Sequence, residues 1–192
     1  MVTPEQIIEI PLSLNEYLIA EYNAKKSECG GVSHVREPED RMETLSVDQR
    51  VGQLGQLAGH KYLFGHIKPY VDGRWYMNRD PRIGDPGSDV ACSNIDFKTS
   101  RLRYPDKPLI DYHLAVRPAE LKTKKVFIQM VADFDSMKQS ATVWLIGWAT
   151  IDMLPKEVAL EGVFAGAYIL PCSQLHPLPP IKWGLDQPEK IV

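Results

Sequence analysis

Two acids and a lysine, the side-chain types that handle metal ions and phosphates, lie close together in the middle of this chain. Asp89 comes seven residues before Asp96, and Asp96 comes two residues before Lys98. Ile95 and Phe97 alternate with the last two, which predicts a strand whose residues two apart share one face. A carboxylate and an ammonium would then project side by side, with Asp89 arriving from a preceding strand. Converging carboxylates suit a hard cation and a neighbouring lysine can act on a phosphate, which is the chemistry of metal-dependent phosphodiester cleavage.

The same spacing of acids and lysine occurs a second time in the chain. Asp111 is followed by Glu120 and Lys122, but Glu120 comes after Arg-Pro-Ala and before a lysine-rich turn, which predicts a loop. Asp96 instead lies between apolar strand residues and after a turn rich in glycine and proline, which favours the first occurrence. The alternative interpretation is a salt-bridge cluster on an edge strand. Burying two acids and a lysine is costly unless they pair with one another or with a metal.

Composition limits the classes of function. The chain has 192 residues, 44% hydrophobic and 24% charged, which predicts one soluble globular domain of ordinary type. The net charge is −3, so any contact with nucleic acid must come from a local patch. No apolar run is long enough to span a membrane, and the first residues lack the features of a secretory signal. Three widely spaced cysteines indicate reduced thiols in an intracellular, cytoplasmic protein.

Two helices are expected to precede the strands. A capping box at Ser13 predicts a helix over 14–27, which the glycine pair at 30–31 would end, followed by a polar loop over 31–44. A second capping box at Ser46 predicts a helix that continues to about Phe64. Three glycines in this helix each cost roughly 1 kcal/mol relative to alanine, which indicates that something, such as the sheet, packs closely there. They are Gly52, Gly55 and Gly59.

The remainder of the chain reads mainly as strands. They are expected at about 70–77, 88–92, 95–100, 109–116, 125–132, 141–149 and 166–170. The runs at 125–132 and 141–149 are almost continuously apolar, as in strands covered on both faces, and Trp144 and Trp148 are expected to share a face in the core. A short helical turn is expected at 150–155 and an irregular, proline-rich tail from Pro171. This order predicts an α/β or α+β fold with a mixed central sheet flanked by helices.

The central stretch, taken with its context, resembles the PD-(D/E)xK nuclease superfamily, phage and prokaryotic type. The matching segments are Gly84–Asp89, Ile95–Ser100, the glycine-bearing helix Gly52–Leu63 and Gly147–Thr150. The resemblance implies a restriction-endonuclease-like core over about 46–155 in a single nuclease-like domain of 1–192. The N-terminal helical segment 1–45 and the proline-rich C-terminal extension 171–192 carry no motif of that superfamily.

The resemblance also implies roles for individual residues. Asp89 and Asp96 would bind Mg²⁺ or Mn²⁺ together with the backbone carbonyl of Phe97, and Lys98 would orient a water or neutralise charge on the phosphate. Gln56 stands where such proteins usually have a catalytic glutamate, and its amide oxygen can contact a metal without supplying charge. The implied substrate is DNA. A homodimer is left open, although no segment marks an interface.

Three alternatives remain open from the sequence. Arg101 and Arg103 either contact a phosphate backbone or form a solvated strand face. The chain either cuts DNA or is a catalytically weak or inactive member that binds nucleic acid or a replication or recombination partner. A third interpretation is a structural or assembly protein in which the acids and the lysine coincide by chance.

Overall fold

The computed structural model describes residues 1–28, 41–76, 94–122, 126–162 and 164–180. The helices are α1 (Leu14–Glu28), α2 (Arg41–Phe64) and α3 (Lys68–Tyr76). The strands are β1 (Ile8–Leu12), β2 (Ile95–Arg101), β3 (His113–Val116), β4 (Val126–Asp135), β5 (Ser140–Thr150) and β6 (Tyr168–Pro171). The 3₁₀ turns are η1 (Pro4–Gln6), η2 (Leu109–Asp111), η3 (Pro118–Lys122), η4 (Ile151–Met153) and η5 (Cys172–Gln174).

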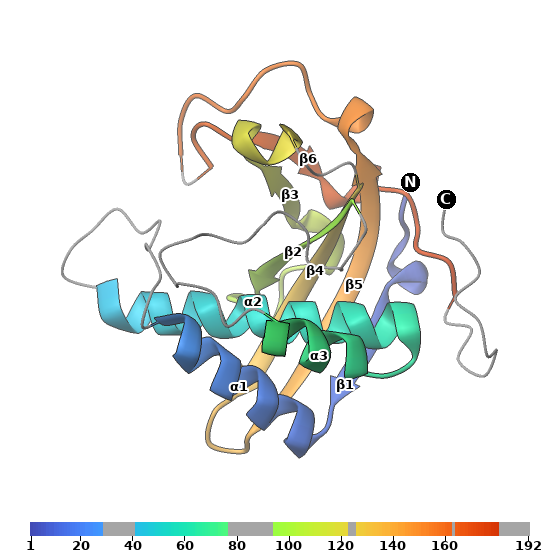
Figure 1. Ribbon diagram of the computed structural model, residues 1–192. Coiled ribbons are helices and arrows are strands. Elements are labelled where there is room, and N and C mark those ends of the chain that lie inside the picture. The colour runs from blue at the N-terminus through green and yellow to red at the C-terminus, as the bar shows by residue number, and fades with distance from the viewer. Residues whose placement is uncertain (29–40, 77–93, 123–125, 163, 181–192) are drawn as a thin grey trace.

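A mixed four-stranded sheet organises the fold. Its strand order is β1-β5-β4-β2, so β1 and β2 form the two edges within the described residues. β2 runs parallel to β4, whereas β4 with β5 and β5 with β1 are antiparallel. β3 and β6 form a separate antiparallel pair. The expected mixed α+β architecture is therefore confirmed at this level of detail (Figure 1).

Apolar side chains form a core on each face of the sheet. Along β4, Ile128 and Met130 pack with the helices, whereas Phe127 and Val131 pack with residues of β3, β6 and η5. This alternation is the period of two that a strand imposes on its side chains. Figure 1 shows the three helices gathered on one side of β4 and β5, with β3 and β6 away from them. The sheet thus has a helix-covered face and a face covered by the small β3–β6 pair.

A β-bulge in β5 changes which face its residues meet. The register with β4 passes from Gln129 opposite Gly147 to Met130 opposite Leu145, which leaves Ile146 as an extra residue. Trp144 therefore packs in the core on the β3–β6 side, and Trp148 packs in the core on the helix side. The expectation that the two tryptophans share a face is wrong, because an unbroken period of two does not hold across a bulge.

Close packing of α2 on β2 explains two of the three helix glycines. A Cβ added at Gly55 would lie 1.8 Å from Oγ1 of Thr99, and one at Gly59 would lie 2.5 Å from Cζ of Phe97. At Gly52 an added Cβ would meet no described atom within 4 Å. The predicted close approach to the sheet is confirmed at Gly55 and Gly59, and wrong at Gly52. The helix backbone lies directly on β2 and fixes that strand in place.

The strand expected at 70–77 is wrong, because the chain forms α3 there. Proline is tolerated in the first turn of a helix, where Pro69 lies, because the amide it lacks would have no intrahelical partner there. Tyr70 then enters the helix-side core, where its hydroxyl donates to Gln53 at 2.8 Å and accepts from Asn23 at 3.0 Å. No local sequence pattern predicts these hydrogen bonds, because they join segments that are far apart in the chain.

Helix boundaries differ from the sequence prediction at one end. α1 begins at Leu14 and α2 ends at Phe64, as expected, but α2 begins at Arg41 rather than after Ser46. Residues 41–45 include arginine, methionine, glutamate and leucine, which are strong helix formers and extend the helix through the second capping-box candidate. The polar loop is thus wrong over 41–44; its remainder and the glycine pair at 30–31 lie outside the described residues.

Two strand predictions also need correction. The strand β1 has no counterpart in the sequence prediction; its Pro11 is tolerated because β1 is an edge strand among the described residues. The strand expected over 109–116 is only β3, since residues 109–111 form η2 instead. Strands β2, β4, β5 and β6 and the turn η4 lie close to their predicted positions. In the part of the chain that the structure describes, no helix has the length and apolar character to cross a membrane.

Replacing Ser13 with alanine is expected to lower the free energy of unfolding by about 1 kcal/mol. The backbone N–H of Ser13 donates to Glu16 Oε2 at 2.8 Å, and the N–H of Glu16 lies 3.4 Å from Ser13 Oγ, so the predicted capping box is confirmed. Urea unfolding measures the change. The comparison variant Glu16→Gln keeps an acceptor for the Ser13 amide but loses the ion pair with Lys61. An unchanged unfolding midpoint for Ser13→Ala would contradict the capping role.

Candidate active site

Asp96 and Lys98 lie side by side on β2, as the strand alternation predicts. Lys98 Nζ is 2.9 Å from Asp96 Oδ2, and the Asp96 side chain is only 2% exposed, against 19% for Lys98. Both project from the face opposite α2, since Phe97 and Thr99 are the β2 residues that contact the helix. A buried carboxylate therefore sits beside an ammonium that solvent still reaches. Such a charge is tolerated inside a protein only when it is compensated.

Glu120, for which the sequence predicts a loop, is the third member of this cluster. Lys98 Nζ donates a hydrogen bond to Glu120 Oε1 at 2.6 Å. The loop expected around Glu120 is instead the 3₁₀ turn η3, which brings the carboxylate to β2. A local signal was present, because proline at the first position and glutamate at the third are typical of a helix start. We call Asp96, Lys98 and Glu120 the β2 charge cluster.

The sheet beneath the β2 charge cluster is closely packed. The parallel register places Phe127 opposite Asp96 and Gln129 opposite Lys98. Phe127 is fully buried, and the buried Gln129 amide donates to Ser100 Oγ at 3.1 Å and to the carbonyl oxygen of Met130 at 2.7 Å. Water is therefore excluded from the sheet side of Asp96. Electrostatic interactions are stronger in such surroundings than in bulk water.

The other two proposed catalytic residues are Gln56 and Asp89. Gln56 belongs to α2, which packs on the opposite face of the sheet, and its backbone carbonyl accepts a hydrogen bond from His60 Nδ1 at 2.7 Å. Asp89 and the strand expected at 88–92 lie outside the described residues. The roles inferred for Gln56 and Asp89 stay predictions.

Arg101 and Arg103, the candidates for nucleic-acid contact, lie near the end of β2. The guanidinium of Arg101 is 5.4 Å from the centroid of the Phe134 ring, on the helix-covered face. Desolvation raises the pKa of Asp48 on α2, and the positive charges of Arg103 and Arg101 partly offset that rise. Both arginines are therefore close to an acid of α2. Arg101 lies on the other face of the sheet from Lys98, so it is not part of the β2 charge cluster.

The donor set of the β2 charge cluster fits a magnesium-type ion only in part. The described residues contain no group of three or more histidine, cysteine, aspartate or glutamate side chains able to hold a metal. Asp96 and Glu120 nevertheless both contact Lys98 Nζ, so their carboxylate oxygens lie close together. Mg²⁺ is commonly held by one or two carboxylates together with waters and substrate phosphates. Asp96, the buried carboxylate of the cluster, satisfies the lower limit of one.

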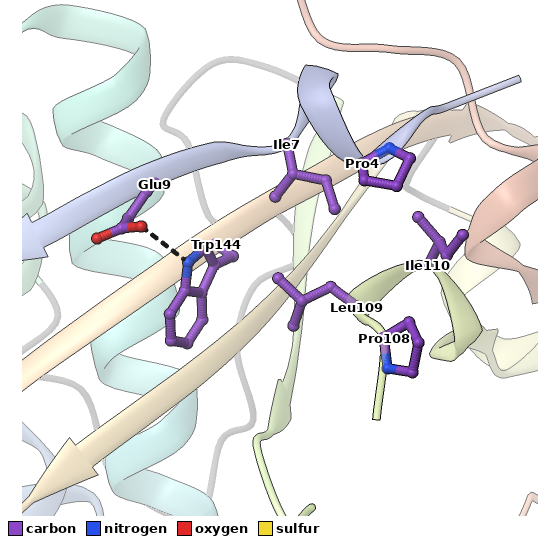
Figure 2. Close-up of a pocket in the computed structure, with 7 residues that line it drawn as sticks. All are labelled: Pro4, Ile7, Glu9, Pro108, Leu109, Ile110 and Trp144. Carbon is purple, nitrogen blue, oxygen red and sulfur yellow. Dashed lines mark hydrogen bonds between the residues drawn. The ribbon is translucent and has the colours of Figure 1, made fainter. Parts of the chain in front are cut away.

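A separate hollow of about 320 Å³ lies at the opposite edge of the sheet, beside β1 (Figure 2). Glu9 supplies its only carboxylate among the lining residues, which accepts a hydrogen bond from Trp144 Nε1 at 3.2 Å. The remaining lining side chains are apolar: Pro4, Ile7, Pro108, Leu109 and Ile110. None of its lining residues belongs to the β2 charge cluster, and β5 and β4 lie between β1 and β2 in the sheet.

Comparison with known proteins identifies no relative of this chain. No protein-family description, curated protein or solved structure matches it.

Proposed function

We propose that this chain is a metal-dependent nuclease that hydrolyses phosphodiester bonds in DNA with Mg²⁺ or Mn²⁺. The observation that carries the proposal is the β2 charge cluster, in which a carboxylate that is 2% exposed adjoins a lysine that solvent reaches. An acid and a lysine two residues apart on a strand are the pair that the resemblance to PD-(D/E)xK nucleases requires. The parallel pairing of β2 with β4 and the close packing of α2 on β2 support a restriction-endonuclease-like core.

Each residue of the cluster would have a distinct task. A bound divalent ion would lower the pKa of a water and stabilise charge on the scissile phosphate. Asp96 would hold that ion in a fixed position, because the packed sheet beneath it leaves its carboxylate little freedom. Lys98 would donate to the phosphate or to the attacking water, which its partial exposure permits. Asp89 and the carbonyl of Phe97 would supply further oxygen ligands.

A second candidate function follows from the engagement of Lys98 with both acids. An ammonium held by Asp96 and Glu120 already compensates their charge, so a metal would have to compete with it. A protein that keeps this ion-pair network would bind nucleic acid, or a replication or recombination partner, without cutting DNA. Measurement of DNA binding and of cleavage on the same samples separates the two candidates.

Replacing Lys98 with alanine is expected to lower the rate of DNA cleavage by about 10²–10³-fold, because one donor to the developing charge is lost. Cleavage of single-stranded, duplex and branched DNA is measured with Mg²⁺, with Mn²⁺ and with a chelator. The matched control is Lys122→Ala, which removes an exposed lysine from the second occurrence of the spacing. That control should retain the wild-type rate.

Two results would contradict the proposal. If the wild-type protein cuts none of the three substrates with either ion, the enzymatic function is wrong. If Lys98→Ala and Lys122→Ala cut DNA equally well, the active site lies elsewhere. Binding of DNA by wild-type protein without cleavage would support the second candidate instead.

A further inference from the structure

Glu120 is anchored at both of its carboxylate oxygens. Oε1 accepts the hydrogen bond from Lys98 Nζ at 2.6 Å, and Oε2 accepts one from the backbone N–H of Arg117 at 2.8 Å. The second bond caps the start of η3, the same turn that carries Glu120. The hydrogen bond from the Arg117 amide therefore holds the carboxylate independently of its contact with the lysine. Its side chain is 24% exposed, so it belongs to the protein surface around Lys98 rather than to the core.

A lysine needs such an anchor to keep one conformation. Its long flexible stem has many rotamers, and holding the ammonium at one point costs conformational entropy. Asp96 contacts Lys98 Nζ from the strand itself, and Glu120 contacts it from η3. Two contacts from separate elements define the position of Nζ far better than either contact alone.

We propose that Glu120 is a positioning residue that holds the ammonium of Lys98 beside Asp96. Its consequence for catalysis rests on the proposed nuclease function, whereas the positioning itself does not. Glu120 would act on the reaction only through Lys98, by keeping Nζ where a scissile phosphate must arrive. This assigns a task to an acid that the resemblance to PD-(D/E)xK nucleases leaves without one.

The positioning is tested first without any substrate. Wild-type protein and the Glu120→Gln variant are reductively methylated with formaldehyde and cyanoborohydride, and the modification of each lysine is followed by mass spectrometry. Methylation of Lys98 is expected to be about two- to fivefold faster in the variant, as the loss of a partly exposed ion pair predicts. Lys107 and Lys122 serve as internal references and should not change. The matched control is Asp111→Asn, an exposed acid of η2.

The catalytic consequence is tested on DNA with the same two variants. Glu120→Gln is expected to lower kcat by about ten- to a hundredfold, the usual effect of losing a group that orients a catalytic residue. KM for DNA should not change, because Glu120 holds Lys98 rather than the substrate. Glutamine can still accept from the Arg117 amide, so η3 is expected to keep its structure. Asp111→Asn should leave both constants unchanged.

Each outcome has one meaning. Equal methylation of Lys98 in wild type and Glu120→Gln would overturn the positioning role. Faster methylation of Lys98 in Glu120→Gln, together with a wild-type protein that cuts no DNA, would support the positioning and overturn the nuclease function. If wild type and Glu120→Gln cut DNA with the same kcat while Lys98→Ala is inactive, the catalytic consequence is overturned.

Discussion

Replacing Asp96 with asparagine is expected to reduce metal-dependent DNA cleavage at least about a thousandfold. Asp96 is the most deeply buried charged side chain of the β2 charge cluster, and the proposed function makes it the fixed ligand of the metal. A metal ion supplies several kcal/mol of transition-state stabilisation, and each 1.36 kcal/mol corresponds to a tenfold change in rate. Asparagine keeps the shape of the side chain, so the loss should come from the charge. Single-turnover cleavage at saturating Mg²⁺ measures it.

The control for this variant is Asp111→Asn, which removes an acid from the second occurrence of the spacing. Mn²⁺ binding, followed by electron paramagnetic resonance, should weaken in Asp96→Asn and stay unchanged in Asp111→Asn. Unfolding in urea shows whether the asparagine variant remains folded. Cleavage at the wild-type rate by folded Asp96→Asn would remove the basis of the proposed site.

Replacing Gly55 with alanine is expected to destabilise the protein by about 1–3 kcal/mol, the usual cost of overpacking. The added Cβ would lie 1.8 Å from Oγ1 and 2.8 Å from Cβ of Thr99, so α2 and β2 must separate. This cost exceeds the gain of about 1 kcal/mol in helix propensity that alanine brings. The free energy of unfolding in urea should fall. Removing the Thr99 hydroxyl and methyl in the double variant Gly55→Ala/Thr99→Ala should recover part of the loss.

Gly52→Ala is the matched control for Gly55→Ala on the same helix. The added Cβ meets no described atom within 4 Å, so only helix propensity acts. This variant should be more stable than wild type by about 0.5–1 kcal/mol. Gly52→Ala is therefore expected to raise the free energy of unfolding, and Gly55→Ala to lower it. If both variants gained stability, α2 would not rest on β2 as closely as the structure places it.

The structural features that were predicted best from the sequence are those that depend only on residues close together in the chain. Asp96 and Lys98 are two apart on a strand, so their common face followed from local geometry alone. The capping box of α1 is equally local. Glu120 reaches Lys98 across 22 positions of sequence, through a turn whose placement depends on β3 packing against the sheet. Its own start signal could predict the turn but not the residue that the turn would meet.

Other errors share this origin in long-range packing. The bulge at Ile146 separates Trp144 from Trp148, and nothing in the apolar run of β5 marks where the extra residue falls. The segment that forms α3 carries aromatic residues typical of a strand. It forms a helix instead, from which Tyr70 makes hydrogen bonds to α1 and α2. Tertiary contacts of this kind override local propensity.

The connection between β2 and β4 makes the β2 charge cluster depend on a less protected part of the fold. Because the two strands are parallel, the chain must cross over between them, and η3 with Glu120 belongs to that crossover. Short 3₁₀ turns open more readily than a central hairpin such as β4–β5. Local opening of the crossover would release Lys98 from Glu120 while β1, β5 and β4 stay paired.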